Sequence, residues 1–496
     1  MANSPTLNEL IAAIKVSADA IQAEASRVEI VNQIISAPVK LGIVSPADAA
    51  ENTKLIRQTV ARYGRFDFDP GLVTIDNDIR VASGNQFHGL GDPSNPSVVK
   101  VVPKSPAVAA RNPAKAWYSI FQSNTDPGQL ANLVGNTFGL PVGPAHGVTI
   151  RNLTLDAGYD EQQASISGSF LTTTEAVSLC GTGLVMEDCV IRNVAKGLSG
   201  GECFAVRVFA PENGRCIEAR PSRLSRIYCD HVGSAVSTHP GAGGDEITLL
   251  SIVGSAVNTA TAPVIQDCLI KGLKRSPQQP SPLHCLHTAY AYGADVRNNT
   301  VLDCDGVGYY QDTGTNLNFR LRGNLFRNVH RGVFLNAITD FGFADFEIVD
   351  NVLSTYSYRP TWNVSSTPAA ILFQKISPVG IGFVGGLITR NRISGSIGDL
   401  GTQHFYPRGL YLETRNAKDV QDLVFRDNQL DVLQPPAGPY YPVGWKGVLS
   451  IYATAGGWDA MSPPMRAWNN RDAKGFLPPI TLVDSGYIPK LSISQL

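Results

Sequence analysis

Four titratable side chains are the candidates for acid and base chemistry in this chain: His287, Asp312, Asp340 and Glu413. Cleavage of a glycosidic bond uses two carboxyl groups about 5 to 10 Å apart. Strands stacked in register lie about 4.8 Å apart, so Asp312 and Asp340 would fall within that range on neighbouring strands. Glu413 would lie three strands from Asp312, which is too far for a pair. Each acid taken alone is more often a solvated surface charge, and a neutral histidine can pack in a strand without a ligand.

Six further side chains are candidates for contacts with a bound substrate: Arg207, Tyr310, Asn336, Gln374, Tyr411 and Arg415. An extended sugar chain is bound by aromatic rings that stack on its faces and by amides that bond its hydroxyls. Carboxylates placed among them can supply the acid and the base. Together with the four titratable groups, these side chains predict a surface that binds and cleaves a polysaccharide.

This grouping depends on aligning four segments that have the pattern of β-strands. With Gly306, Gly332, Ala370 and Gly409 set level, alternation along each strand sorts the residues that follow into two faces. The inward set is Val307, Tyr309, Val333, Leu335, Ile371, Phe373, Leu410 and Leu412. The outward set is Tyr310, Asp312, Phe334, Asn336, Leu372, Gln374, Tyr411, Glu413 and Arg415. We expect His287 and Arg207 to join the outward face from earlier strands.

A short repeated phrase gives the reason to expect stacked strands. An Asn or Cys follows a polar residue and precedes an aliphatic one at nine places: Asn152, Cys189, Cys229, Cys268, Asn299, Asn324, Asn351, Asn391 and Asn428. The shortest steps, of 25 and 27 residues, are typical of one structural unit stacked on the next. Asn tolerates the left-handed conformation at a corner, and Cys is small and often buried. We therefore expect these residues to lie above one another at one bend of the chain.

The repeat resembles that of right-handed parallel β-helix proteins of the pectate-lyase type, in which asparagines form a ladder along one corner. We predict an all-β fold of this kind, because a β-propeller would need a longer and more regular period. The segment from Asn52 to Gly91, with its Pro70-Gly71 turn, resembles the start of phage tailspikes. That resemblance implies a trimer that acts on a bacterial surface polysaccharide.

The catalytic signatures of the family do not carry over to this chain. There is no acidic cluster like the calcium site of pectate lyases, and no set of Asn-Thr-Asp, Asp-Asp, Gly-His-Gly and Arg-Ile-Lys segments as in polygalacturonases. The segment from Ala219 to Arg223 is only faintly similar to the lyase arginine motif. Since one fold hosts many functions, fold alone does not decide the activity.

Two alternatives to hydrolysis therefore stay open. The first is β-elimination on a uronate polymer, in which Arg207, Arg331 or Arg415 neutralises the carboxylate and His287 or Tyr310 acts as the base. The second is a non-catalytic spike with a structural or adhesive role, including a subunit of a larger surface assembly.

The N-terminal region is predicted to be helical. Within residues 1–37, apolar residues recur at alternating steps of four and three, which is the coiled-coil period and predicts an oligomerisation helix. A single amphipathic helix lying on the end of the β-helix is the alternative. Residues 38–110 are expected to hold a capping helix and the first turns of the β-helix, with Ser45 as the N-cap and Leu55, Ile56 and Val60 plugging the open end.

The rest of the chain divides into two predicted regions. Residues 111–433 are expected to form the main β-helix with loop insertions. Residues 434–496 begin with a proline-rich break and are expected to form a small module that caps the helix, holds an oligomer together or binds a receptor. The loop from His239 to Glu246 matches no zinc spacing, and we predict neither a metal site nor a cofactor.

Composition excludes several classes of protein. The 496 residues include 41 Lys and Arg against 42 Asp and Glu, a net charge of −1 that does not suggest a nucleic-acid-binding protein. We see neither a Sec-type signal nor an apolar stretch long enough to cross a bilayer, so no membrane insertion is expected. All eight cysteines fall between Cys180 and Cys304, and we expect reduced core residues.

Taken together, these patterns predict a tailspike-like polysaccharide depolymerase that hydrolyses a bacterial surface glycan. Its expected partners are that glycan and further copies of the chain, with a trimer implied by the resemblance. We expect it on a virion tail or an extracellular surface assembly, docked through its N-terminus.

Overall fold

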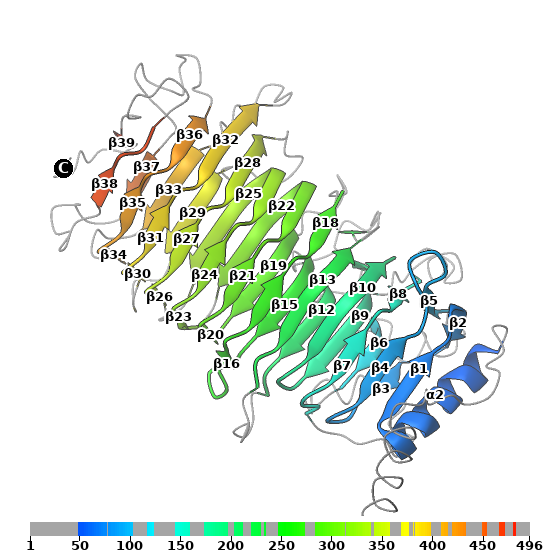
Figure 1. Ribbon diagram of the computed structural model, residues 1–496. Helices are drawn as coiled ribbons and strands as arrows, with labels where there is room; N and C mark the ends of the chain where they lie inside the picture. The colour runs from blue at the N-terminus through cyan, green and yellow to red at the C-terminus, as the bar shows by residue number, and fades with distance from the viewer. Residues whose placement is uncertain are drawn as a thin grey trace, which may run out of the picture.

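The structure of the protein, a computed structural model, describes the chain in segments that together form one rod (Figure 1). The described residues are 48–76, 78–102, 117–123, 144–158, 173–196, 203–211, 220–229, 233–234, 247–272, 283–312, 314–338, 342–357, 369–375, 380, 382–397, 408–414, 419–432, 449–453, 466–471 and 480–482. Helix α2 (Ala49–Tyr63) lies at one end of the rod and β39 (Ile480–Leu482) at the other. Between them the strands pair almost entirely in parallel with strands of the next turn, which confirms the predicted parallel β-helix.

Between residues 260 and 432 a full turn of the coil consists of four strands, each of which stacks on its counterpart in the next turn. We call the four stacks A, B, C and D in the order in which the chain passes through them. Stack A is a separate six-stranded sheet: β16 (Ala260–Thr261), β20 (Ala291–Tyr292), β23 (Asn316–Leu317), β26 (Phe343–Ala344), β30 (Phe383–Val384) and β34 (Val420–Gln421).

Stack B follows stack A after a two-residue bend. It contains β1 (Arg65–Phe68), β4 (Gln86–Gly89), β7 (Thr149–Arg151), the first halves of β10 (Val185–Arg192) and β13 (Arg223–Cys229), β17 (Val264–Gln266), β21 (Asp295–Arg297), β24 (Arg320–Arg322), β27 (Glu347–Val349), β31 (Leu387–Thr389), β35 (Val424–Arg426) and β38 (Arg466–Trp468).

Stack C follows stack B after a second two-residue corner. It contains β2 (Gly71–Ile75), β5 (Ser97–Val101), β8 (Thr154–Asp156), the second halves of β10 and β13, β18 (Leu269–Lys271), the first halves of β22 (Thr300–Asp312) and β25 (Leu325–Ala337), β28 (Val352–Ser357), β32 (Arg392–Ile397) and β36 (Gln429–Val432).

Stack D closes each turn. It contains β3 (Ile79–Arg80), β6 (Trp117–Gln122), β9 (Thr173–Cys180), β12 (Cys203–Phe209), β15 (Ile247–Val253), β19 (Leu283–Ala289), the second halves of β22 and β25, β29 (Ala369–Lys375), β33 (Arg408–Thr414), β37 (Leu449–Ala453) and β39. Two short strands, β11 (Ala195–Lys196) and β14 (Gly233–Ser234), pair with each other beside it.

The core of the rod is a column of apolar side chains from every stack. In stack B the residues in register at the inward position are Val296, Leu321, Ile348, Ile388 and Phe425, all buried. Aromatic rings stack along the axis as well, for example Phe343 on Phe383 at 5.3 Å. Burial of this column is the main stabilising contribution, because each added turn removes apolar surface from water.

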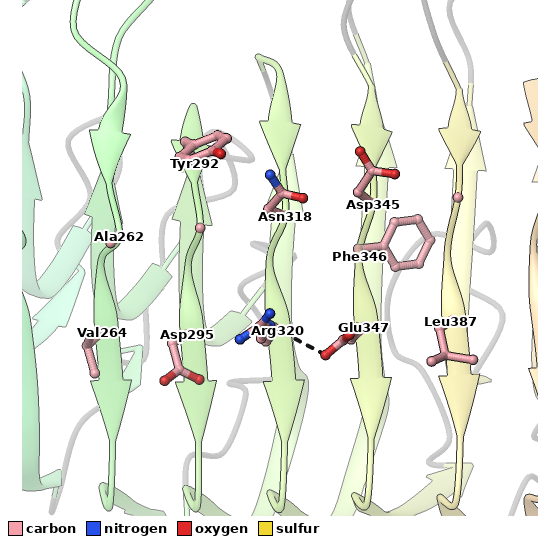
Figure 2. A pocket seen from close by; sticks show the side chains of 12 residues that line it. Ala262, Val264, Tyr292, Asp295, Asn318, Arg320, Asp345, Phe346, Glu347 and Leu387 are labelled. Carbon is pink, nitrogen blue, oxygen red and sulfur yellow. Dashed lines mark ion pairs between the residues drawn. The ribbon is translucent and has the colours of Figure 1, made fainter.

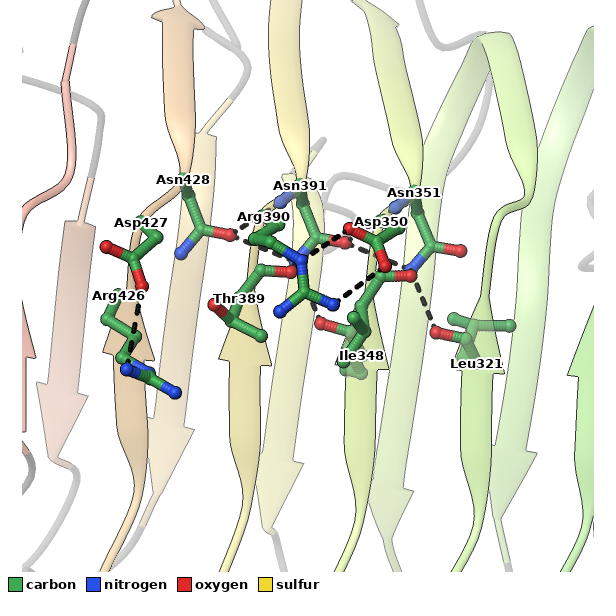
Figure 3. Close-up of polar contacts among 11 residues, drawn as sticks. Leu321, Ile348, Asp350, Asn351, Thr389, Arg390, Asn391, Arg426, Asp427 and Asn428 are labelled. Atoms are coloured by element: carbon green, nitrogen blue, oxygen red, sulfur yellow. Dashed lines mark hydrogen bonds and ion pairs between the residues drawn. The ribbon is translucent and has the colours of Figure 1, made fainter.

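A ladder of asparagines runs along the corner between stacks B and C (Figure 3). Each side-chain oxygen accepts hydrogen bonds from the backbone N–H and the side-chain Nδ2 of the asparagine one turn earlier, as Asn391 does from Asn351 at 3.0 Å for both. Each Nδ2 also donates to a backbone carbonyl across the corner, such as Asn391 Nδ2 to Ile348 O at 2.8 Å. The ladder runs from Asn299 through Asn324, Asn351, Asn391 and Asn428 to Asn470.

The residue before each ladder position adopts a left-handed backbone, which makes the corner. Asn298, Asp350 and Asp427 have φ values of 54°, 57° and 55°. Arg390 has φ 54° there, and its guanidinium pairs with both carboxylate oxygens of Asp350 at 2.8 Å (Figure 3). The buried ladder is thus accompanied by exposed charged pairs on the same corner.

Two of the nine predicted ladder residues lie elsewhere. Cys229 lies two residues beyond the ladder position, which Ile227 takes because it is in register with Cys189. Asn152 is the left-handed residue before the corner, with φ 52°, and Leu153 follows it. The repeated phrase, with Asn at one place and Cys at the other, matched at both, but the register is set by the inward apolar residues.

The strands of stack D contain a break in alternation that the sequence alignment missed. Gly308, and not Gly306, is level with Gly332, because Tyr309 is in register with Val333 and the pairing shifts between Cys304 and Val307. A side chain at Gly332 has no space, since a Cβ there would lie 2.5 Å from the carbonyl oxygen of Ala370. The break turns Val307 outward, against the prediction, where it packs with Tyr310 and Ala369.

Helix α2 begins three residues later than predicted. Asp48 is its N-cap and accepts a hydrogen bond from Glu51 N at 3.0 Å, whereas Ser45 lies outside the described residues. Ile56 and Val60 are buried against the first turns as expected, and Leu55 is partly exposed. In the described part of the chain, no helix has the length and apolarity needed to cross a bilayer. The predicted coiled coil of residues 1–37 lies outside the described residues.

The coil continues past the predicted boundary at residue 433. β37 pairs with β33, β38 pairs with β35, and Asn470 accepts from Asn428 as the next ladder member. The described part of residues 434–496 therefore belongs to the β-helix itself. The seven described cysteines are free thiols buried in the rod, in agreement with the prediction of reduced core residues.

Candidate functional site

A chain of hydrogen-bonded side chains crosses successive strands on the outward face of stack D. Ser251 Oγ lies 3.0 Å from His287 Nδ1, and His287 Nε2 lies 3.1 Å from Asp312 Oδ1. Tyr310 donates from its hydroxyl to Asp312 Oδ2 at 3.2 Å, and Asn336 Nδ2 donates to the Tyr310 hydroxyl at 3.3 Å. Five side chains from four neighbouring turns thus form one network, in which His287 and Tyr310 contact the Asp312 carboxylate directly.

The strand register explains why these residues meet. Ser251, His287 and Tyr310 are paired in sequence across β15, β19 and β22, so their side chains form one column. Asp312 is two residues beyond Tyr310 on β22, and alternation brings it back to the same face. The sequence prediction that His287, Tyr310, Asp312 and Asn336 share a face is therefore correct.

The hydrogen-bond directions follow from the chemistry of the groups. An ionised carboxylate only accepts hydrogen bonds, so His287 donates through Nε2–H and Nδ1 accepts from the Ser251 hydroxyl. Ser251 has 0% of its surface exposed and cannot reach a substrate in this arrangement. It instead fixes the tautomer of His287. Asp312 is the more exposed member of the ion pair, at 14% of its side chain against 9% for His287.

Aromatic and cationic groups flank this network. His284 stacks on the Tyr310 ring at 3.7 Å, and the Phe334 ring lies 5.2 Å away on the other side. The guanidinium of Arg331 lies over Phe334 at 4.6 Å, and that of Arg408 lies over Tyr411 at 4.0 Å. Burial lowers the pKa of Arg331 to about 10, and Glu413, Tyr310 and Tyr411 act in the opposite direction.

Gln374 and Glu413 form a second polar group on this face. Gln374 Nε2 donates to Glu413 Oε2 at 2.9 Å, and the two residues are in register across β29 and β33. Asp312 and Glu413 are separated by three turns, or about 14 Å, so they do not form a catalytic pair. Tyr411 belongs to the outward column but is buried, with Phe334 and Leu372 as its neighbours in the cluster.

Arg207 lies further along the same face, beside an acid that the sequence prediction missed. Its guanidinium lies over the rings of Phe204 at 4.6 Å and Phe209 at 4.5 Å. Burial raises the pKa of Glu175 to about 7, while Arg207 and hydrogen bonds from Ser119 Oγ and Phe204 N oppose the shift. Glu175 is therefore an acid that can hold its proton near neutral pH.

Two predicted site residues, Asp340 and Arg415, lie outside the described residues. The residues that the sequence reasoning missed are Ser251, His284, Glu175 and Arg408. Strand alternation extended to β15 would have placed Ser251 on the outward face with Arg207 and His287. On β9 it would not have found Glu175, because Ser178 is in register with Arg207 and alternation then puts Glu175 on the side of the buried Val177. Among the described residues, no group of three or more His, Cys, Asp or Glu side chains is arranged to hold a metal ion.

Comparisons with known proteins yielded solved structures alone. No protein-family model and no curated protein sequence matches the chain. An exopolygalacturonase from Thermotoga maritima is 10% identical, with a TM-score of 0.37 over 73% of this chain and 88% of that one. PfbA, a surface adhesin of Streptococcus pneumoniae, is 10% identical, with a TM-score of 0.40 over 91% of each chain. The catalytic domain of a GH87 α-1,3-glucanase in complex with tetrasaccharides is 10% identical, with a TM-score of 0.33 over 93% of this chain and 70% of that one.

Proposed function

We propose that the chain binds an extended polysaccharide along the outward face of stack D and cleaves it at Asp312. The observation that carries this proposal is the hydrogen-bond network that ends on Asp312. Buried side chains, Ser251, His287 and Tyr310, orient a carboxylate whose own side chain is partly exposed. Such preorganisation is typical of a group that acts on a reacting centre, since a bare surface acid needs no such support.

Hydrolysis is the reaction that we propose first. Asp312 would act as the nucleophile or as the base that activates water, held in place by His287 and Tyr310. A second carboxyl group must then protonate the leaving oxygen. Asp340 remains the sequence-based candidate for this acid, because Glu413 is too far along the rod.

β-Elimination on a uronate polymer is the second candidate, and one contact favours it. The Tyr310 hydroxyl lies between Asp312 and Asn336, so it can pass a proton to the carboxylate. Arg331 is near enough for the two side chains to influence each other electrostatically, and it could neutralise a uronate carboxylate. In this scheme the Tyr310 hydroxyl takes the proton beside the uronate carboxylate and passes its own proton to Asp312. The glycosidic bond breaks as the double bond forms, and the released sugar oxygen takes the proton from Asp312.

The test is incubation of the full chain with a panel of capsular and lipopolysaccharide glycans. New reducing ends without ultraviolet absorbance indicate hydrolysis, and absorbance of an unsaturated product indicates elimination. If the reaction is hydrolysis, Asp312→Asn should lower the cleavage rate at least a thousandfold, and Tyr310→Phe should lower it far less. If the reaction is elimination, Tyr310→Phe should lower the cleavage rate at least a thousandfold.

A matched control is Asp188→Asn, which changes an exposed acid at the B/C corner that pairs with Arg226. This variant should cleave at the wild-type rate. If Asp312→Asn also cleaves at that rate while remaining folded, Asp312 has no catalytic role. If the wild-type chain binds a glycan and cleaves none, the adhesive alternative holds.

We also propose that the chain assembles as a trimer through residues 1–37, as the heptad pattern and the tailspike resemblance imply. Light scattering on the full chain and on a chain that starts at residue 38 tests this. A full chain that is monomeric at micromolar concentration contradicts it.

A further inference from the structure

A groove of about 700 Å³ lies where stack A bends into stack B (Figure 2). It spans five turns, from β16 and β17 to β30 and β31, and its volume is in the range of small-molecule binding sites. None of its lining residues belongs to stack D, so it is separate from the network around Asp312.

The shape of the groove follows from the residues at the A/B bend. One residue in each turn has a left-handed backbone there: Ala262, Gly293, Asn318, Asp345 and Gly385, with φ between 42° and 68°. Three of the five have no side chain beyond a methyl group, which leaves the bend open. Asn318 and Asp345, on adjacent turns, carry the polar side chains of this row (Figure 2).

An exposed aromatic ring stands at the same level. Tyr292 on β20, a strand of stack A, has 49% of its surface exposed. Figure 2 shows Tyr292, Asn318 and Asp345 on three successive strands, in a row that runs across the strands and therefore along the rod. An exposed ring next to amide and carboxylate groups is the combination that binds sugar rings, by stacking and by hydrogen bonds to hydroxyls.

The second row of the groove is charged but largely self-neutralised. Arg320 lies 3.4 Å from Glu347, and both are about half exposed. Asp295 pairs with Arg297 at 2.8 Å and with Arg322 at 2.9 Å. Because each of these acids has an arginine partner, the row offers many donors and acceptors with little net charge. A polyanion would therefore gain little electrostatic binding energy from this row.

From these observations we propose that the A/B groove is a second, non-catalytic binding site for a neutral, hydroxyl-rich polysaccharide lying along the rod. Adjacent turns repeat their polar groups about every 4.8 Å, so two turns match the length scale of two linked sugar rings. Tyr292 is the stacking platform, and Asn318 with the Arg320 and Glu347 pair bonds the hydroxyls. The inference goes beyond the proposed cleavage site and does not depend on it.

The test measures binding of the full chain to neutral oligosaccharides of α-glucan, β-glucan, mannan and galactan, with polygalacturonate oligosaccharides as the anionic comparison, by titration calorimetry. At least one neutral probe should bind more tightly than the anionic one. Tyr292→Ala should weaken that binding about tenfold, whereas Tyr292→Phe should keep it within about twofold. Tyr63→Ala is the matched control, because Tyr63 is 53% exposed on α2 at the end of the rod.

Asp312→Asn separates this inference from the proposed function. Binding to the groove should be unchanged in that variant even if it abolishes cleavage, and it should be measurable even if the wild-type chain cleaves nothing. The inference is overturned if no neutral probe binds to the wild-type chain, or if Tyr292→Ala binds as tightly as the wild type or Tyr63→Ala loses as much.

Discussion

Replacing Asn351 by alanine should destabilise the rod by about 4 kcal/mol. The Asn351 side chain accepts from Asn324 N at 3.0 Å and Nδ2 at 2.9 Å, and it donates to Leu321 O at 2.9 Å and to Asn391 Oδ1 at 3.0 Å. Alanine leaves the buried Asn324 N–H and the Leu321 carbonyl without these bonds. Each buried group left unsatisfied costs about 1 to 3 kcal/mol, so two such groups give the expected value.

The comparison that isolates the ladder is Arg390→Ala. Arg390 pairs with Asp350 on the same corner, and the two side chains are 56% and 53% exposed. Alanine keeps a Cβ at the left-handed position, so the backbone cost is unchanged and only the exposed ion pair is lost. That pair should contribute less than about 1 kcal/mol.

The assay is guanidinium unfolding followed by circular dichroism, with the free energy taken from the midpoint and slope of each variant. Asn351→Ala should shift the midpoint several times further than Arg390→Ala. Raised salt should remove the effect of Arg390→Ala and leave that of Asn351→Ala intact. Equal shifts in the two variants would refute the view that buried amide bonds, rather than exposed charge pairs, hold this corner.

Three further predictions concern other parts of the rod. Cys268→Asn should raise the free energy of unfolding by about 1 kcal/mol in the same assay. Cys268 occupies the ladder position one turn before Asn299, so the new amide extends the ladder. A lower free energy of unfolding in this variant would contradict the prediction. The pKa of Glu175 is raised from its ordinary 4.5 to about 7, so the folded state binds this proton more tightly than the unfolded state does. About 3 kcal/mol of stability is therefore lost as the pH rises from 4.5 through 7. Glu175→Gln should therefore flatten the stability profile between pH 5 and 8, and an unchanged profile would place the titration elsewhere. Gly332→Ala should lower stability by about 3 kcal/mol, because its Cβ would lie 2.5 Å from a backbone oxygen. Gly64→Ala should lower it by about 1 kcal/mol, because Gly64 has φ 68° but open space around it. Thermal melts in which Gly64→Ala is the less stable variant would disprove the steric argument.

The β-helix could be predicted from the sequence because its signal is local and repeated. Asn299, Asn324 and Asn351 recur at nearly one turn's length, and each occupies the same corner in the structure. A repeated turn places the same residue type in the same surroundings many times, so the pattern accumulates where one copy would be ambiguous. Strand alternation likewise placed Tyr310, Asp312 and Asn336 on one face.

Errors arose where one turn departs from the average. The outward position of Val307 depends on a break in alternation at Gly308, which is set by how closely the next turn approaches. Cys229 matched the repeated phrase, yet inward packing gave the corner to Ile227. The local sequence predicts neither position, because both depend on contacts with residues one turn away.

The sequence by itself determined the coil, its polar corner and the face that carries His287 and Asp312, since residue spacing along a regular strand decides these. Only the tertiary structure decided that Ser251 and Tyr310 hold His287 and Asp312 in one network, that Glu175 is buried enough to keep its proton, and that the A/B bend is open beside Tyr292. Hydrogen bonds, burial and empty space depend on distances between turns, and those distances exist only once the chain is wound.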